Sequence, residues 1–130
     1  MAQVTGLGGI FIKAREPEAL AEWYRAHLGV PYKKGEGAVF LWKDDPPTDG
    51  GMTVFCVFPA ATKYFEPSPA PFMINFRVDD LDALLAKLAS AGVQIDPKRD
   101  DYDYGRFAWI YDPEGNKVEL WEPAKTNPNP

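Results

Sequence analysis

The chain has 130 residues and a mass of 14.5 kDa, a size that suits one domain with its own core and is too small for two ordinary domains. Its 45% apolar and 25% charged residues are typical of a globular protein. A net charge of -5 argues against nucleic acid or an anionic membrane surface as a partner, because both require a basic face. We therefore expect a single domain over residues 1–130, with no nucleic-acid partner and no membrane partner.

Two residue counts restrict the chemistry further. Cys56 is the only cysteine and His27 the only histidine, which excludes an internal disulfide, a cysteine-based zinc site and any site built on two histidines of one chain. The apolar stretch at residues 6–12 is too short to span a membrane and lacks the basic flank of a signal peptide. These features favour a reducing cytoplasm as the location.

The first half of the chain is predicted to contain a strand, a helix and two short strands. Residues 7–14 read as the first strand, and a helix then begins at Glu16 and Pro17, because proline suits the first helical position and acidic residues suit the first turn. Gly29 ends this helix. Short strands are predicted at 38–42 and 52–58, with a turn over 44–51. Four prolines within residues 59–71 exclude a helix or a central strand there, so we interpret this segment as a linker.

The second half repeats the same order of elements. Residues 72–78 form a strand, Asp79 and Asp80 are candidates to cap a helix that ends at Gly92, and residues 107–123 form a β-hairpin around the turn 112–116. A shift of 64 residues superimposes parts of the two halves, including Ile10 on Ile74 and Glu16 on Asp80. The pattern predicts an α+β fold with two βαβββ modules in tandem, over residues 5–58 and 72–123, and a tail at 124–130.

Strand parity separates the side chains of the predicted sheets into two sets. One set is apolar and should face the helices: Ile10, Ile12, Ala14, Val54, Cys56, Ile74, Phe76, Val78, Val118 and Leu120. The other set mixes aromatic and polar residues, as binding clefts do: Gly9, Phe11, Lys13, Thr53, Phe55, Val57, Met73, Asn75, Arg77, Lys117, Glu119 and Trp121. A five-residue turn would place Trp109 opposite Glu119, whereas a slip of one residue would turn Trp109 under the helix.

Three segments of the chain resemble the vicinal oxygen chelate superfamily, which includes glyoxalase I, bleomycin-resistance and fosfomycin-resistance proteins and extradiol dioxygenases. They are residues 10–29, residues 76–92, and the hairpin 112–123 with its Asp-Pro-Glu-Gly-Asn turn and Glu-Leu pair. The resemblance implies paired βαβββ modules that form an open half-barrel cleft, and commonly a homodimer. It also implies a divalent metal held by four matching strand positions.

Those four positions carry Gly9, Phe55, Met73 and Glu119 in this chain. Hard divalent cations need several oxygen or imidazole donors, which one carboxylate cannot supply. We therefore expect a degenerate metal site and no cofactor, with Glu119 as the one candidate ligand if a divalent metal is bound.

Candidate ligand-binding residues come from the mixed face and from the loop at 100–106. For Glu119, an ion pair with Arg77 or Lys13 and a contact with a ligand both stay open, besides a role as metal ligand or general base. Tyr104 and Arg106 lie in a loop that borders the cleft in the resembled family, although the loop could equally be an acidic solvated turn. The predicted ligand-binding set is Phe11, Phe55, Asn75, Arg77, Tyr104, Arg106, Trp109, Glu119 and Trp121, and no residue is predicted to be catalytic.

Three functions compete for this sequence. The first is a metal-free protein that binds a small, partly aromatic or cationic molecule. The second is a metal-dependent lyase or dioxygenase with an atypical site, and the third is an interaction or regulatory domain without a ligand. The missing metal ligands and the mixed face favour the first.

Overall fold

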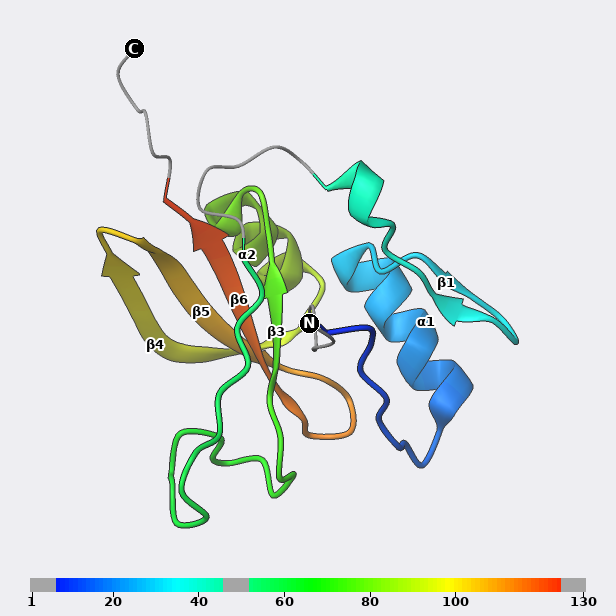
Figure 1. The fold of residues 1–130 in the computed structure, drawn as a ribbon, viewed down its shortest axis with the longest axis horizontal. Helices are drawn as coiled ribbons and strands as arrows, with labels where there is room; N and C mark the ends of the chain where they lie inside the picture. The colour runs from blue at the N-terminus through cyan, green and yellow to red at the C-terminus, as the bar shows by residue number, and fades with distance from the viewer. Residues whose placement is uncertain (1–6, 46–51, 125–130) are drawn as a thin grey trace, which may run out of the picture.

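The computed structural model describes residues 7–45 and 52–124, which form two helices and a four-stranded sheet together with smaller elements (Figure 1). The elements in chain order are α1 (Pro17–Leu28), β1 (Tyr32–Lys33), β2 (Gly37–Ala38), the 3-10 helix η1 (Trp42–Asp44), β3 (Ile74–Arg77), α2 (Leu81–Ser90), β4 (Gln94–Tyr102), β5 (Gly105–Tyr111) and β6 (Lys117–Pro123).

The four-stranded sheet has the order β3-β6-β5-β4, with β3 parallel to β6 and the other pairs antiparallel. Together with α2, these strands form the βαβββ module predicted for the second half, so the α+β class is confirmed. The predicted register of the hairpin is also confirmed, because Trp109 lies opposite Glu119 and Phe107 lies opposite Trp121. On the other side of β6, Asn75 of β3 is the partner of Glu119.

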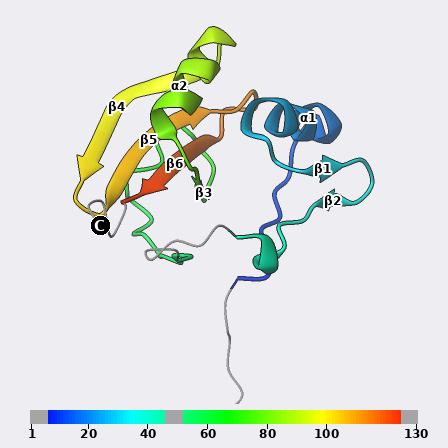
Figure 2. The same ribbon diagram turned by 90° about the horizontal axis from the view of Figure 1, so that it is seen from above.

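Helix α2 covers one face of this sheet, and α1 lies beyond the edge formed by β3 (Figures 1 and 2). The strand residues of this core alternate along β5 and β6, as parity predicts; they are Ala108, Ile110, Val118 and Leu120, with Phe76 and Val78 packed against them. The helices contribute Leu20, Tyr24, Leu81 and Leu88. We refer to the opposite face of the sheet as the aromatic face; it is formed by Asn75, Arg77, Phe107, Trp109, Lys117, Glu119 and Trp121.

The turn between β5 and β6 is organised by the buried carboxylate of Asp112. Its Oδ1 accepts hydrogen bonds from the backbone N–H groups of Glu114 (2.9 Å) and Asn116 (3.0 Å). Its Oδ2 accepts from the side-chain amide of Asn116 (2.7 Å) and from the hydroxyl of Tyr24 on α1 (2.8 Å). Gly115 has φ of +84°, a conformation that glycine adopts without steric cost. The turn is therefore stabilised by hydrogen bonds within it and is hydrogen-bonded to α1.

The same turn caps the N-terminus of α1. The Glu114 carboxylate accepts hydrogen bonds from the backbone N–H groups of Arg15 and Glu16, each at 2.8 Å. Glu16 is the N-cap residue of α1 and Arg15 precedes it, so the carboxylate binds one unpaired N–H group of the helix end and the amide just before it. The predicted ends of the helix are confirmed, since Pro17 begins α1 and Gly29 ends it in the left-handed conformation.

The first half of the chain differs from the prediction. Residues 7–14 and 52–58 are not strands, and the strand predicted at 38–42 is replaced by the short β1–β2 hairpin and η1. A strand requires a neighbouring strand for its backbone hydrogen bonds, and parity along one segment does not supply that neighbour. Ile12 and Ala14 nevertheless pack against the core, so alternation correctly predicts their burial. Most of the predicted turn at 44–51 and nearly all of the tail at 124–130 lie outside the described residues.

Large apolar side chains of the first half are exposed. Phe11 is 95% exposed, Trp42 80%, Phe55 77% and Val57 86%. Cys56, which parity places among the buried residues, is also exposed because no helix covers residues 52–58. The described residues of the first half therefore leave several large apolar side chains in contact with solvent. In the part of the chain that the structure describes, neither helix is long and apolar enough to cross a membrane.

The capping of α1 by Glu114 predicts a specific dependence of stability on pH. The hydrogen bonds from the backbone N–H groups of Arg15 and Glu16 lower the pKa of the Glu114 carboxyl. A carboxyl whose pKa is lowered by folding stabilises the folded protein at pH values above its ordinary pKa of about 4.3. This stabilisation is lost as the pH falls through the lower pKa of the folded state. We expect Glu114→Gln to reduce the free energy of unfolding most at about pH 6.5 and progressively less toward about pH 3.5, as measured by urea denaturation.

The control is Glu36→Gln, which changes an exposed glutamate in the β1–β2 turn. Its difference from the unmodified protein should stay small and nearly constant with pH. A Glu114→Gln difference that was equally constant would contradict the capping role.

Candidate functional site

Glu119 is the centre of the aromatic face. It lies on β6 and is 8% exposed. Its Oε1 accepts a hydrogen bond from the side-chain amide of Asn75 (2.6 Å), and its Oε2 accepts from the indole N–H of Trp109 (3.0 Å) and the hydroxyl of Tyr64 (2.5 Å). Two of these donors lie on the neighbouring strands β3 and β5, so sheet register itself positions them.

All three donors to Glu119 are uncharged, and the described residues contain no ion pair of this carboxylate. The ion pair with Arg77, one of the alternatives left open for Glu119, does not form, because the Arg77 guanidinium instead contacts Asp45 Oδ1 at 3.1 Å. Arg77 lies opposite Trp121 along the parallel β3–β6 pair, two residues beyond Asn75, which is opposite Glu119. A buried carboxylate that lacks a cation depends on its hydrogen bonds to offset the cost of leaving water. The three donors therefore offset the cost of burying this carboxylate.

Tyr64 reaches this carboxylate from the proline-rich segment 59–71. Its ring stacks on Phe58, with centroids 5.5 Å apart and planes 9° apart, and meets Trp109 edge-on at 6.1 Å and 89°. The Lys117 ammonium lies 5.6 Å from the centre of the Tyr64 ring. It also donates to the backbone carbonyls of Tyr64 (2.8 Å) and Glu66 (3.1 Å). The segment interpreted as a linker thus contributes a side chain to the site.

The Tyr64 hydroxyl is a hydrogen-bond donor at neutral pH. Burial raises the pKa of Tyr64, and the hydrogen bond to Glu119 raises it further. Because a tyrosine normally ionises near pH 10, a raised pKa keeps the proton on this hydroxyl across the physiological range. Glu119 is therefore the acceptor in this pair.

A second group of aromatic side chains continues the face toward the β4–β5 turn. Tyr102 and Tyr104 stack with centroids 5.0 Å apart, and both contact Phe107, each at 6.0 Å. Phe107 stacks on Trp121 at 6.3 Å. A Cβ at Gly105 would lie 2.5 Å from Trp121 Nε1, so only glycine lets this indole pack against the strand. Tyr104, predicted from the loop, and Trp121, predicted from parity, belong to one aromatic surface.

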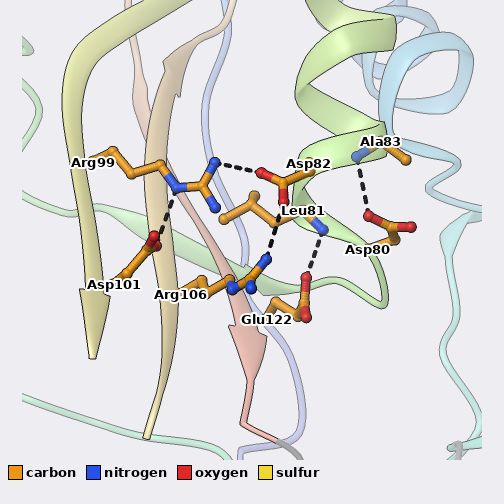
Figure 3. Close-up of polar contacts among 8 residues, drawn as sticks. All are labelled: Asp80, Leu81, Asp82, Ala83, Arg99, Asp101, Arg106 and Glu122. Carbon is orange, nitrogen blue, oxygen red and sulfur yellow. Dashed lines mark hydrogen bonds and ion pairs between the residues drawn. The ribbon is translucent and has the colours of Figure 1, made fainter. Parts of the chain in front are cut away.

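Arg106 lies on the other face of the sheet, at the N-terminus of α2 (Figure 3). Its guanidinium donates to Asp82 Oδ2 (3.0 Å), while Arg99 donates to the other oxygen of Asp82 (2.6 Å). The first N–H of α2, at Leu81, donates to Glu122 (2.8 Å), and Asp80 caps the amide of Ala83 (3.0 Å) as predicted. The structure therefore does not bring Arg106 to Glu119.

The other predicted residues lie at the margin of this group. Phe11 and Phe55 are largely exposed and belong to the first half, where the sheet in the described residues is the two-stranded β1–β2 pair and includes neither residue. Arg77 borders a hollow of about 340 Å³ lined by Pro31, Val39, Phe40, Leu41, Asp44 and Asp45. Of the predicted ligand-binding residues, Asn75, Trp109 and Glu119 are brought together by hydrogen bonds, and Trp121 and Tyr104 lie in the adjoining aromatic group.

The residues around Glu119 do not fit a divalent metal. The carboxylate is surrounded by N–H and O–H donors, whose hydrogens compete with a cation for the same lone pairs. Within residues 7–45 and 52–124, no group of three histidine, cysteine, aspartate or glutamate side chains gathers in a way that could hold an ion. We derive no chemistry through a metal at this site.

Sequence reasoning missed Tyr64, Phe58 and the role of Lys117. Lys117 has the correct parity for the aromatic face, but its contact with the segment 59–71 is a tertiary one that parity does not encode. The available signal was the pair Tyr64-Phe65 within a proline-rich loop, because loops on a rigid sheet often carry binding groups.

Residues 6–120 match the family model described as the Glyoxalase/Bleomycin resistance protein/Dioxygenase superfamily. A curated relative, named "Putative glyoxylase CFP32" in Mycobacterium bovis, is 32% identical over 103 residues, which are 69% of this chain and 40% of that protein. The same name is carried by a Mycobacterium tuberculosis protein with the same identity and coverage. The chain thus spans less than half the length of the curated relatives it matches.

Two solved structures share the fold over most of the chain. One is a glyoxylase/bleomycin resistance protein/dioxygenase domain from Frankia sp. EAN1pec, with TM-score 0.61, 19% identity, and coverage of 95% of this chain and 96% of that one. The other is TnmS3, described as an antibiotic binding protein from Streptomyces sp. CB03234, with TM-score 0.54, 24% identity, and coverage of 87% and 91%. At these identities the likeness concerns the fold.

Proposed function

The chain belongs to the glyoxalase/bleomycin resistance protein/dioxygenase superfamily, and we propose that it binds a small organic molecule on its aromatic face. The observation that carries this proposal is the buried carboxylate of Glu119, which is held by uncharged donors beside aromatic rings. Binding sites for small molecules typically combine apolar and aromatic walls with a few fixed polar groups.

The arrangement suits recognition better than structural support. The donors of the other buried carboxylate, Asp112, belong to its own turn and to α1, whereas one donor of Glu119, Tyr64, comes from a half-buried position in a loop. Asn75 is exposed although it orients Glu119, so the polar group can be approached from solvent on that side. The fold is also that of a solved protein described as antibiotic binding, which is consistent with a ligand on this fold.

The proposal includes a degenerate metal site. The family positions for metal ligands carry Gly9, Phe55, Met73 and Glu119, and the donors around Glu119 supply protons where a cation would need lone pairs. A metal-dependent lyase or dioxygenase is the competing function. The location is proposed to be cytoplasmic from the single exposed cysteine.

Ligand binding on the aromatic face predicts which tryptophans respond. In a titration followed by NMR of the indole N–H groups, a small aromatic ligand should shift the signals of Trp109 and Trp121, because both lie on this face. Trp23, which packs against the core from α1, is the internal control and should not shift. A thermal-shift screen of aromatic antibiotics and metabolites supplies the ligands. If no compound shifts Trp109 or Trp121, the third function, an interaction domain without a small ligand, replaces this proposal.

The degenerate metal site predicts that purified protein holds no stoichiometric transition metal. Protein prepared without chelator and examined by elemental analysis should contain well under one equivalent of Ni, Zn, Mn or Fe per chain, and added metal should not raise the melting temperature. One equivalent of metal that is lost in Glu119→Gln, with a fall in melting temperature on chelation, would favour the metal-dependent enzyme instead.

We also propose that the chain forms a homodimer through the first half. Exposed apolar side chains of this size are unusual on a monomer and mark a contact surface, here argued from Phe11, Trp42, Phe55 and Val57. A second copy is the partner that the family resemblance implies.

Sedimentation equilibrium should then give twice the mass of one chain for the unmodified protein. The double change Phe55→Ser and Val57→Ser should shift the equilibrium toward the single chain, because it removes apolar area from the proposed contact. Tyr104→Ser, which changes an exposed aromatic residue of the other half, is the matched control and should leave the dimer intact. An unmodified protein that sediments as a single chain would overturn the proposal.

A further inference from the structure

The phenol ring of Tyr64 is contacted on each of its chemically distinct parts. Its hydroxyl donates to Glu119 Oε2 at 2.5 Å, one ring face stacks on Phe58, and the ring lies edge-to-face with Trp109. The Lys117 ammonium lies 5.6 Å from the ring centre, within range of a cation–π contact. These contacts together describe a site shaped for a phenol.

The acceptor of this site does not depend on Tyr64 for its orientation. Asn75 donates to one oxygen of Glu119 and Trp109 to the other, and both donors belong to strands of the same sheet. If Tyr64 withdrew, Glu119 would keep two hydrogen bonds and would present a free lone pair in a fixed direction. The site would then be ready to accept a hydrogen bond from another molecule.

Tyr64, in contrast, is held by a loop at the surface. Its side chain is only half-buried, and Lys63, Glu66 and Pro67 around it are exposed. Apart from the contacts of the Tyr64 side chain itself, the loop is tied to the sheet through Lys117, which donates to the carbonyls of Tyr64 and Glu66. Breaking these few contacts would free the ring without disturbing the core, which lies on the other face of the sheet.

Charge decides which molecules could take the place of Tyr64. The Glu119 carboxylate disfavours an anionic group at the hydroxyl position, and the neighbouring Lys117 ammonium disfavours a cationic ring. A neutral ring that donates one hydrogen bond satisfies both. An aromatic ring without a donor would leave the carboxylate with an unused acceptor position.

We propose that Tyr64 is an internal occupant of a phenol-binding site, and that the ligand of this protein carries a neutral phenolic ring that displaces Tyr64 and donates its hydroxyl hydrogen to Glu119. The inference rests on the proposed function, because it names the chemical class of the molecule bound on the aromatic face. It adds that binding requires the segment around Tyr64 to move away from the sheet.

The test removes the Tyr64 ring by mutation and adds phenol as a free ligand. Tyr64→Ala removes the phenol ring, and phenol itself is the probe, with benzene as the matched probe that lacks the hydroxyl. Titrations followed at the Trp109 indole N–H signal should show phenol binding to Tyr64→Ala roughly tenfold or more tightly than benzene, the effect expected for one hydrogen bond to a carboxylate. Glu119→Gln in the Tyr64→Ala background should lose most of this preference. Equal binding of phenol and benzene, or no binding of phenol to folded Tyr64→Ala, overturns the inference.

A second variant keeps the test valid if Tyr64→Ala does not fold. Tyr64→Phe retains the ring and loses only the hydroxyl, so it weakens the internal competitor, and phenol should bind it more tightly than the unmodified protein, whereas Tyr32→Phe, a change outside the site, should have no effect. Unchanged phenol affinity in Tyr64→Phe overturns the inference. The proposed function fails separately, when no compound of any class shifts Trp109 or Trp121 in the unmodified protein. Ligands that shift these signals but bind no better after Tyr64→Phe would leave the proposed function standing and remove the phenol class alone.

Discussion

The carboxylate of Asp112 is the contact on which the rest of the structure depends. It is buried and accepts four hydrogen bonds, three from its own turn and one from Tyr24 of α1. A buried carboxylate with fewer partners would cost free energy, so these bonds restrict the turn to one length and one shape. Because turn length determines the register of a hairpin, Asp112 also determines that Trp109 and Glu119 lie side by side.

The two buried carboxylates of this hairpin differ in how replaceable their partners are. The donors to Asp112 belong to its own turn and to α1, a helix that is itself part of the core. Two donors to Glu119 likewise belong to the sheet, but the third, Tyr64, comes from a half-buried position in a surface loop. Only at Glu119 can a donor be exchanged while the fold stays intact. That difference separates a structural carboxylate from one suited to recognition, although both are buried.

Much of the second half could be predicted from the sequence because its determinants are local. Proline, glycine and aspartate mark the helix ends and the turn, and alternation identifies the helix-facing residues Phe76, Val118 and Leu120. The first half could not be predicted in the same way. Residues 7–14 and 52–58 have the alternation of strands, but a strand also requires a partner, which is a tertiary property.

The site follows the same division between local and tertiary information. Asn75, Trp109 and Glu119 were predictable because strand parity and hairpin register bring them together. The sequence places Arg106 in a loop beside the site, but in the structure it lies on β5 and shares the helix-facing side of Ala108 and Ile110. Its guanidinium pairs with Asp82 of α2. Tyr64 could not be found by either rule, since it reaches Glu119 from 55 positions away through a segment without regular structure.

The β5–β6 hairpin divides stability and recognition between its two faces. Ala108, Ile110, Val118 and Leu120 point to the helices and form the core, and Glu122 on the same side caps α2. The alternate positions form the aromatic face, and the loop around Tyr64 covers part of it through the contact with Trp109. Because the side-chain period of a strand is two, a change at one position alters one face with little effect on the other. The aromatic face can therefore accept substitutions while the fold is maintained by the helix-facing positions.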